Sequence, residues 1–299
     1  MKVLRAPSEA ERAERAVAIG TFDGVHRGHR AVIDAARGTG LRSAVLTFDP
    51  HPRLVLGYEV QLLATFERRL ELLRDADPDD VLVVEFTSEL SRLSPEEFVE
   101  RVLAPFGTRI VVTGEGFRFG AGRRGDLDLL GRLGLEVRPV PLLGGVSSSR
   151  IRALLREGDV RGAASLLGRP PEVEGTVVAG DQRGGTLGFP TANLAPPPRL
   201  LVPAHGIYAG EADPGDGRRY RTALSIGVNP HYGGVERRIE AFLLDFEGDL
   251  YGERLRIELW DRLRDERSFS SEGELVAQIA RDVEAARGAT RPLEGHAPL

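Results

Sequence analysis

The chain has 299 residues, enough for two domains that each bury a core. Its 40 basic and 45 acidic residues give a net charge of −5, so no overall basic field favours nucleic acid as a partner. Lys2 is the sole lysine and cysteine is absent, which excludes P-loop, lysine Schiff-base, thiol and thiolate-zinc chemistry.

Short apolar runs alternate with helical stretches in the N-terminal half, and this alternation predicts βαβ units around a parallel sheet. A helix is expected at 29–37, and another begins near Pro95, where Ser94 and Glu97 form a capping box. The predicted strands are 16–19, 43–48, 81–86, 109–113 and 136–140.

A helical pair is predicted for 147–167, and it ends at Gly168, before two prolines. We therefore predict an α/β domain at 1–168 and a second domain at 172–290. In the second domain, turns rich in glycine, proline, aspartate and asparagine separate short strands, a pattern typical of a small antiparallel barrel. The predicted strands are 172–178, 207–211, 220–226, 238–246 and 254–259.

A terminal helix is predicted to begin at Ser271, with Glu274 completing a capping box, and to end before Gly288. Its apolar stripe consists of Val276, Ile279, Ala280 and Val283. No apolar run reaches the ~20 residues needed to span a bilayer, and residues 1–18 carry too much charge for a secretory signal. We therefore expect a cytoplasmic protein with no membrane partner.

The first strand leads into a turn rich in glycine and histidine. Gly20, Gly24 and Gly28 let a ligand approach the backbone, and the next helix offers unpaired amides and a positive dipole end to an anion. His26 and His29 can donate to phosphate oxygens and stabilise charge on a pentavalent phosphorus. A purely structural turn is one alternative. A zinc pair is another, although the spacing fits it poorly and no thiolate can complete the site.

This turn resembles the HxGH signature of the nucleotidylyltransferase superfamily, in the form found in bacterial bifunctional riboflavin kinase/FAD synthetases. Segments that resemble the family's other N-terminal motifs follow in order: Phe48-Asp49-Pro50-His51-Pro52, 114–120, and Ser147-Ser148-Ser149-Arg150-Ile151-Arg152. The resemblance implies a Rossmann-like domain whose motifs surround ATP and FMN. The implied nucleotide contacts are Gly20, Phe22, Asp23, Gly24, Ser147, Ser148, Ser149, Arg150 and Arg152, and the implied flavin contacts are Phe48, Pro50, His51 and Phe117.

Residues 180–193 begin as a glycine-rich loop and end in Pro190-Thr191-Ala192-Asn193. Flexible glycines can fold over a triphosphate, and the proline restricts the backbone that aims the threonine and asparagine. Hydroxyl and amide oxygens are ligands that suit Mg²⁺. The residues alone also allow a hairpin that binds nothing.

The stretch 188–193 resembles the GFPTAN segment of the riboflavin kinase family, and 205–208, 227–230 and 240–252 resemble its later segments. The resemblance implies that Glu240 is the base for the ribityl 5′-hydroxyl; a solvated strand carboxylate is the alternative. It further implies Mg-ATP contacts at Gly180, Gly188, Thr191 and Asn193, metal ligands at Thr191 and Asn193, and flavin contacts at Asp249 and Tyr251.

The resemblance predicts an enzyme that phosphorylates riboflavin to FMN and then adenylylates FMN to FAD, with ATP as co-substrate and Mg²⁺ as cofactor. Gly116 stands where the family usually has Asp or Asn, and Ser149 where it usually has Thr. One alternative is therefore a riboflavin kinase whose N-terminal domain is inactive or repurposed. A second alternative is a flavin-binding protein without catalysis.

Overall fold

The computed structural model describes residues 1–180, 188–231 and 234–293, with the side chains of 229–237 also outside the description. The chain forms two compact units, Met1–Ser148 and Ser149–Leu299. This division falls earlier than the predicted boundary at residue 168. The reason is that the helical pair contacts the second unit: Ala204 N–H donates to the carbonyl of Leu155 (3.0 Å), and Arg161 pairs with Asp261 (3.1 Å).

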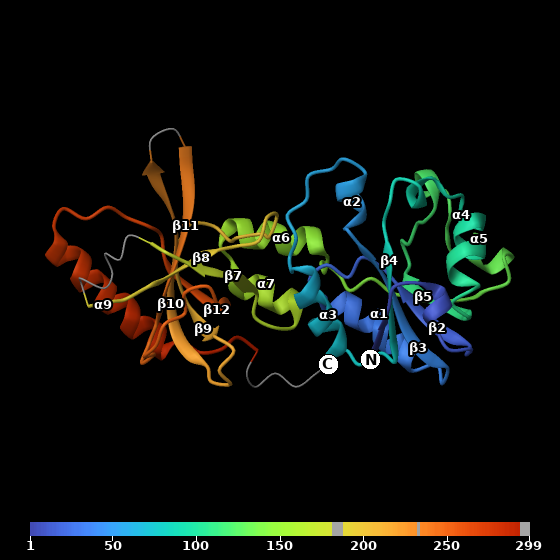
Figure 1. Ribbon diagram of the computed structural model, residues 1–299, viewed down its shortest axis with the longest axis horizontal. Coiled ribbons are helices and arrows are strands. Elements are labelled where there is room, and N and C mark those ends of the chain that lie inside the picture. The colour runs from blue at the N-terminus through green and yellow to red at the C-terminus, as the bar shows by residue number, and fades with distance from the viewer. Residues whose placement is uncertain (181–187, 232–233, 294–299) are drawn as a thin grey trace. The chain divides into compact units, whose positions relative to one another are not determined.

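The N-terminal unit contains the predicted parallel sheet, with strand order β1-β4-β3-β2-β5-β6 (Figure 1). Its strands are β1 (Lys2–Leu4), β2 (Arg15–Ile19), β3 (Arg42–Asp49), β4 (Asp80–Glu85), β5 (Thr108–Gly114) and β6 (Glu136–Val140). The five predicted strands are confirmed, whereas the three-residue β1 was not predicted. All strands are parallel, but the chain adds β3 and β4 on one side of β2 and then β5 and β6 on the other side. Parallel α/β sheets bind ligands at the carboxyl ends of the strands beside such a switch point.

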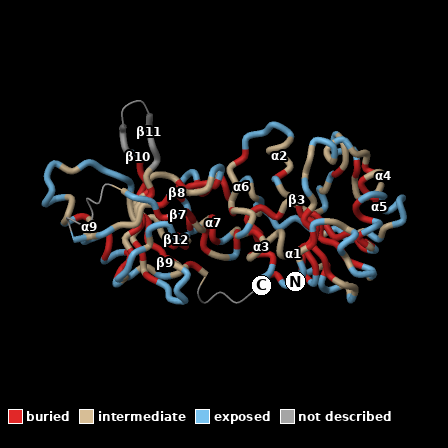
Figure 2. Tube along the Cα trace, viewed as in Figure 1, coloured by how far each residue is buried: buried red, intermediate tan, exposed pale blue. Residues whose placement is uncertain are grey.

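Helices cover both faces of this sheet. Along β2, Ala16 and Ala18 pack into one core with residues of α1 and α3, while Val17 and Ile19 pack into the opposite core with α4 and α5. The helical segments of the unit are η1 (Pro7–Glu9), α1 (Arg27–Arg37), α2 (Pro52–Val55), α3 (Phe66–Arg74), η2 (Leu90–Arg92), α4 (Pro95–Phe98), η3 (Val99–Leu103), η4 (Ala121–Arg123) and α5 (Leu127–Arg132). Figure 2 shows buried residues concentrated in these strands and exposed residues in the loops. The predicted capping box at Ser94 and Glu97 is confirmed.

An ion-pair network closes the amino ends of the strands. Arg15 and Asp80, both 1% exposed, are joined by a bond of 2.9 Å from Nε, and Arg42 adds a fork of 2.7 and 2.9 Å to the same carboxylate. Arg15 also donates to the carbonyl of Phe106 (2.9 Å). Buried charges are tolerated where partners satisfy them, and here the two ion pairs with Asp80 tie β2 and β3 to β4.

The second unit begins with the predicted helical pair, α6 (Ser148–Glu157) and α7 (Val160–Leu167), followed by a closed antiparallel barrel with strand order β10-β11-β8-β7-β12-β9. The strands are β7 (Glu172–Val178), β8 (Ala192–Ala195), β9 (Gly206–Asp213), β10 (Tyr220–His231), β11 (Gly234–Leu243) and β12 (Arg254–Arg264). The predicted barrel is confirmed. The short strand β8 was missed, because a glycine-rich run and Pro190 precede it.

The terminal helix, α9 (Glu272–Gly288), differs from the prediction in its cap and its buried face. Ser271 caps it, but the Glu274 carboxylate accepts from Ser270 (3.1 Å from N–H, 2.8 Å from Oγ), and Gly288 lies inside the helix. Ala280, which we placed on the apolar stripe, is exposed. The buried face is Gln278, Asp282, Val283 and Ala286, because Arg264 donates a fork to Asp282 and makes a polar residue acceptable there. No helix in the described ranges is long and apolar enough to cross a membrane.

Candidate active sites

The turn after β2 has a strained backbone. Phe22 and Val25 both have left-handed φ values, 52° and 40°, and Gly24 has φ 80°. Left-handed backbone is unfavourable for a β-branched or bulky residue and costs on the order of 1–3 kcal/mol, so it persists where surrounding structure enforces it. Phe22 and Val25 are fully buried. Their packing therefore holds the turn in this shape, at the carboxyl end of the central strand.

His26 and His29 stack on each other at the start of α1. Their ring centroids are 3.6 Å apart with an interplanar angle of 11°, and the Nδ1 atom of His26 accepts from the backbone N–H of His29 (3.2 Å). Because His26 Nδ1 is an acceptor, a neutral His26 carries its proton on Nε2. A Cβ on Gly28 would lie 3.2 Å from the His26 ring, so this glycine gives the ring its space.

Burial lowers the pKa of His29 well below 6.5, and the charge of His26 lowers that pKa further. The Phe22 ring lies 5.1 Å from the His29 ring and supplies part of that apolar environment. In the described part of the chain, His29 Nδ1 is buried and has no hydrogen-bond partner. A neutral imidazole at this position can donate one N–H to an incoming oxygen without carrying a fixed charge.

Asp23, predicted as a nucleotide contact, ties the turn to its neighbours. Its carboxylate is buried and accepts from the N–H of Leu63 (2.9 and 3.2 Å), while its carbonyl accepts from Ser148 Oγ (3.1 Å). The Leu63 side chain also lies where a Cβ on Gly24 would fall, at 2.9 Å. Within the first unit the structure thus brings Asp23 and Ser148 together with the histidine turn. Of the other predicted residues of that motif, Ser147 belongs to the first unit, and Ser149, Arg150 and Arg152 belong to the second.

The predicted flavin contacts of the first unit lie on two segments. His51 follows β3 and caps α2, with Nδ1 accepting from Arg53 N–H (3.2 Å), and Phe48 packs edge-on against Phe86 at 5.5 Å. Phe117 stacks on Phe119 at 5.7 Å in the loop after β5. Gly116 beside it is exposed, and a Cβ there would meet no atom within 4 Å.

Sequence reasoning missed Arg69 and Thr47, which support the histidine turn. The Thr21 carbonyl accepts from both Thr47 Oγ1 (3.1 Å) and Arg69 Nη1 (3.1 Å). The available signal was the position of Arg69 three and four residues before Leu72 and Leu73, a spacing that places a charged residue on the buried face of α3.

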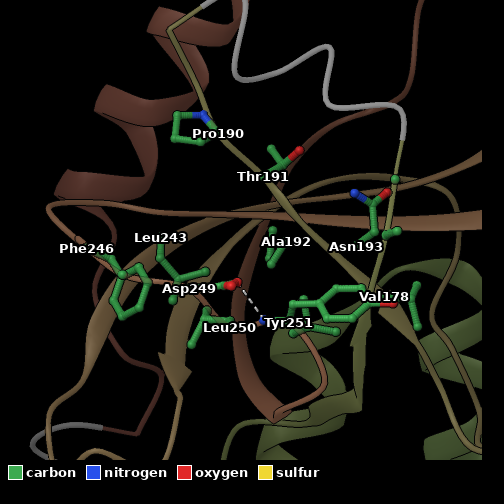
Figure 3. Close-up of a pocket in the computed structure, with 15 residues that line it drawn as sticks. Val178, Pro190, Thr191, Ala192, Asn193, Leu243, Phe246, Asp249, Leu250 and Tyr251 are labelled. Carbon is green, nitrogen blue, oxygen red and sulfur yellow. Dashed lines mark hydrogen bonds between the residues drawn. The ribbon is translucent and has the colours of Figure 1, made fainter.

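The barrel contains a cavity of about 250 Å³ at the meeting point of β7, β8, β11 and the turn at 246–251. Figure 3 shows its side chains, with Val178 and Tyr251 toward one end and Phe246 and Leu243 toward the other. Of the predicted site residues, Gly180, Thr191, Asn193, Asp249 and Tyr251 line it. Residues 181–187, the body of the predicted glycine loop, lie outside the described residues, and Gly188 has left-handed φ (84°).

Asn193 lines the cavity from strand β8. It pairs with Val178 of β7 on one side and with Glu240 of β11 on the other. A Cβ on Gly180 would lie 2.1 Å from the Asn193 amide nitrogen, so any larger residue at position 180 would displace the amide. Glu240 is half-buried and forms an ion pair with Arg238 (3.2 Å). The strand register therefore places the Glu240 carboxylate on the strand next to Asn193, which lines the cavity, while Glu240 itself is outside the cavity lining.

The same cavity suits an aromatic ring and a hard cation. Tyr251 is 65% exposed and its N–H donates to Asp249 (2.9 Å), and apolar side chains from three other segments complete the wall. The Thr191 hydroxyl and the Asn193 amide are neutral oxygen donors, which fits Mg²⁺ shared with phosphates and water.

A histidine turn at the switch point of a parallel sheet, in one chain with a barrel whose cavity combines hydroxyl, amide and carboxylate groups, defines a two-domain transferase acting on phosphate esters. The FAD synthetase family model matches residues 8–146, and the riboflavin kinase model matches residues 167–290. The chain belongs to the bifunctional riboflavin kinase/FMN adenylyltransferase family.

Relatives bearing that family name match along nearly the whole chain. The Escherichia coli K12 protein is 36% identical over 313 residues, covering 98% of this chain and 100% of its own. The Bacillus subtilis protein is 35% identical over 295 residues, covering 92% of each. A crystal structure from Streptococcus pneumoniae, described as a macrolide-efflux protein, is similar with a TM-score of 0.87 and 30% identity, covering 96% of this chain and 99% of that one.

Proposed function

We propose that the chain catalyses two ATP-dependent reactions in series. The barrel unit transfers the γ-phosphoryl group of ATP to riboflavin, giving FMN and ADP. The N-terminal unit then transfers AMP from a second ATP to FMN, giving FAD and pyrophosphate. We place both in the cytoplasm, where ATP is supplied.

In the kinase reaction, Glu240 accepts the proton of the ribityl 5′-hydroxyl as its oxygen attacks the γ-phosphorus and the bond to the β-phosphate oxygen breaks. The isoalloxazine ring packs in the apolar part of the cavity, beside Tyr251 and Phe246. Thr191 and Asn193 would hold Mg²⁺ through their oxygens. When bound, the cation neutralises charge on the phosphates; the protein residues orient the alcohol and the base.

In the adenylyl transfer, a phosphate oxygen of FMN attacks the α-phosphorus of ATP, and the bond between that phosphorus and the bridging oxygen breaks to release pyrophosphate. His26 and His29 donate to the non-bridging oxygens as negative charge develops on them. The amides at the start of α1 and the hydroxyl of Ser148 bind the remaining phosphate oxygens.

The observation that carries this proposal is the pairing of Asn193, which lines the cavity, with Glu240 on the neighbouring strand, in a chain whose other unit holds the stacked histidine pair. The test is chromatography of purified protein incubated with riboflavin, ATP and Mg²⁺. We expect FMN followed by FAD, with FAD formation abolished and FMN formation retained in His29→Ala. The absence of any flavin product would overturn the proposal, and FMN alone would support the kinase-only alternative.

A further inference from the structure

Arg69 lies at the carboxyl ends of two strands although it belongs to helix α3. Its side chain is buried, with the residue only 5% exposed. Nη1 donates to the Thr21 carbonyl (3.1 Å) and Nη2 to the Phe48 carbonyl (2.9 Å). One planar guanidinium therefore bridges the segment that follows β2 and the end of β3.

These two carbonyls belong to the first and second motifs of the N-terminal site. Thr21 precedes Phe22, the left-handed residue whose ring lies 5.1 Å from the His29 ring. Phe48 lies three residues before His51, which caps α2. The orientation of the two peptide groups thus determines how both motifs leave the sheet.

Stability alone gives little reason for a cation at this place. The nearest described carboxylate, Asp49, lies 3.5 Å from Nη2 and is 39% exposed. In the described chain, Nε of Arg69 is buried without a hydrogen-bond partner. Burial lowers the pKa of Arg69, while the charge of Asp49 raises it. The hydrogen bonds of Arg69 thus go to backbone carbonyls and not to a carboxylate, and its loss would leave those two carbonyls without this donor.

Arg42 provides a contrast within the same sheet. It lies at the amino ends of the strands, and both its Nε and Nη2 bond the Asp80 carboxylate, at 2.7 and 2.9 Å. A complete ion pair accounts for Arg42, whereas Arg69 binds carbonyls at the functional edge. Arg42 therefore contributes to stability, whereas the contacts of Arg69 fix the position of two backbone segments.

We propose that Arg69 is a positioning residue for adenylyl transfer, whose forked guanidinium fixes the Thr21 and Phe48 carbonyls and thereby aligns the histidine turn with the second motif. This inference rests on the proposed function of the N-terminal unit. A displacement of about 1 Å at a reacting group costs on the order of 10²-fold in rate. Loss of the fork therefore lowers kcat for FAD formation rather than substrate binding.

The test compares Arg69→Met, Arg69→Lys and the control Arg42→Met, with FMN supplied directly so that FAD formation does not depend on the kinase. For Arg69→Met we expect kcat for FAD formation to fall on the order of 10²-fold, with the KM values for ATP and FMN changed by less than about twofold. Arg69→Lys keeps the charge but not the planar fork, so its kcat falls about tenfold. Arg42→Met lowers Tm and leaves kcat unchanged.

Riboflavin phosphorylation and Tm measured on each variant separate positioning from general damage. A wild-type kcat in Arg69→Lys, or in Arg69→Met, overturns the inference. A fall in kcat that is matched by equal losses in riboflavin phosphorylation also overturns it. If Arg69→Met does not fold, Arg69→Lys against Arg42→Met decides the question. A wild-type protein that forms no FAD contradicts the proposed function instead.

Discussion

Glu240 on β11 and Asn193 on β8 are direct cross-strand partners, and the register of the barrel places them side by side. Side chains directly opposite each other on antiparallel strands have Cβ atoms about 5 Å apart. A carboxylate and an amide oxygen at that separation can serve one phosphoryl transfer, the first as a base for the alcohol and the second as a ligand for the cation on the phosphates. This relationship leads to two predictions for the barrel.

Glu240→Gln should lower kcat for FMN formation on the order of 10²- to 10⁴-fold, because the amide has the shape of the carboxylate but cannot accept the alcohol proton. FAD formation from supplied FMN should not change. The measurement is steady-state kinetics of each reaction separately. Glu211→Gln is the control, since Glu211 is a half-buried strand carboxylate paired at 3.7 Å with Arg221. Wild-type FMN formation in Glu240→Gln would contradict the assigned base.

Gly180→Ala should lower kcat/KM for FMN formation by at least about tenfold. The added Cβ would lie 2.1 Å from the Asn193 amide nitrogen, so the amide must leave its position beside Glu240. Gly273→Ala, where a Cβ meets nothing within 4 Å, is the control. Both variants are compared by kinase assay with a Mg²⁺ titration. Unchanged affinity and rate in Gly180→Ala would show that the amide position is unimportant.

The stability of the N-terminal unit should depend on His29 below about pH 6.5. Burial holds the pKa of His29 in the folded protein below 6.5, so the unfolded chain binds more protons as the pH falls through that value. Stability is therefore complete above pH 6.5 and decreases below it. Thermal unfolding from about pH 8 to about pH 5 should show a smaller decrease in Tm for His29→Asn than for wild type. Equal decreases would contradict a neutral, buried His29.

Gly116→Asn should fold like wild type, because a Cβ at this exposed turn position has open space around it. We expect wild type to form FAD without a polar side chain there, so kcat/KM for FAD formation should change by less than about tenfold. Gly131→Asn on α5, also with open space, controls for a new surface amide. If wild type accumulates FMN and Gly116→Asn begins to form FAD, the kinase-only alternative is correct.

Much of the fold was predictable because burial on two faces and turn chemistry leave local signals. The strands that form β2 to β6 are short apolar runs between turns, and the barrel strands follow Gly, Pro, Asp and Asn. Strand β8 was not predictable in this way: it has four residues, and its neighbours β7 and β11, not its composition, make it a strand. The predicted buried face of α9 was partly wrong for a related reason: Arg264, on the distant strand β12, pairs with Asp282 and allows this polar residue to be buried.

The site residues also differ in whether local sequence signals indicate them. His26, His29, Thr191 and Asn193 stand in contiguous motifs, so the sequence alone indicates them. Arg69 acts through backbone carbonyls of residues 21 and 48, and such acceptors are present at every position of a chain. Only the folded sheet brings those two carbonyls together. A residue that acts through backbone carbonyls is therefore identified from the structure and not from a sequence motif.

The two units differ in how they prevent strands of separate molecules from pairing. In the second unit the strands close into a ring, β10-β11-β8-β7-β12-β9, so within the barrel each described strand has a neighbour on both sides. Beyond Ile226 of β10 and before Glu240 of β11, these two strands pair only with each other. The open sheet ends in β1 and β6. Strand β1 has three residues and carries Lys2. Strand β6 carries the charged residues Glu136 and Arg138, followed by Pro139, which has no N–H to donate. Short length, a lysine and a proline thus protect the sheet from edge-to-edge aggregation, whereas closure protects the strand segments that form the barrel ring.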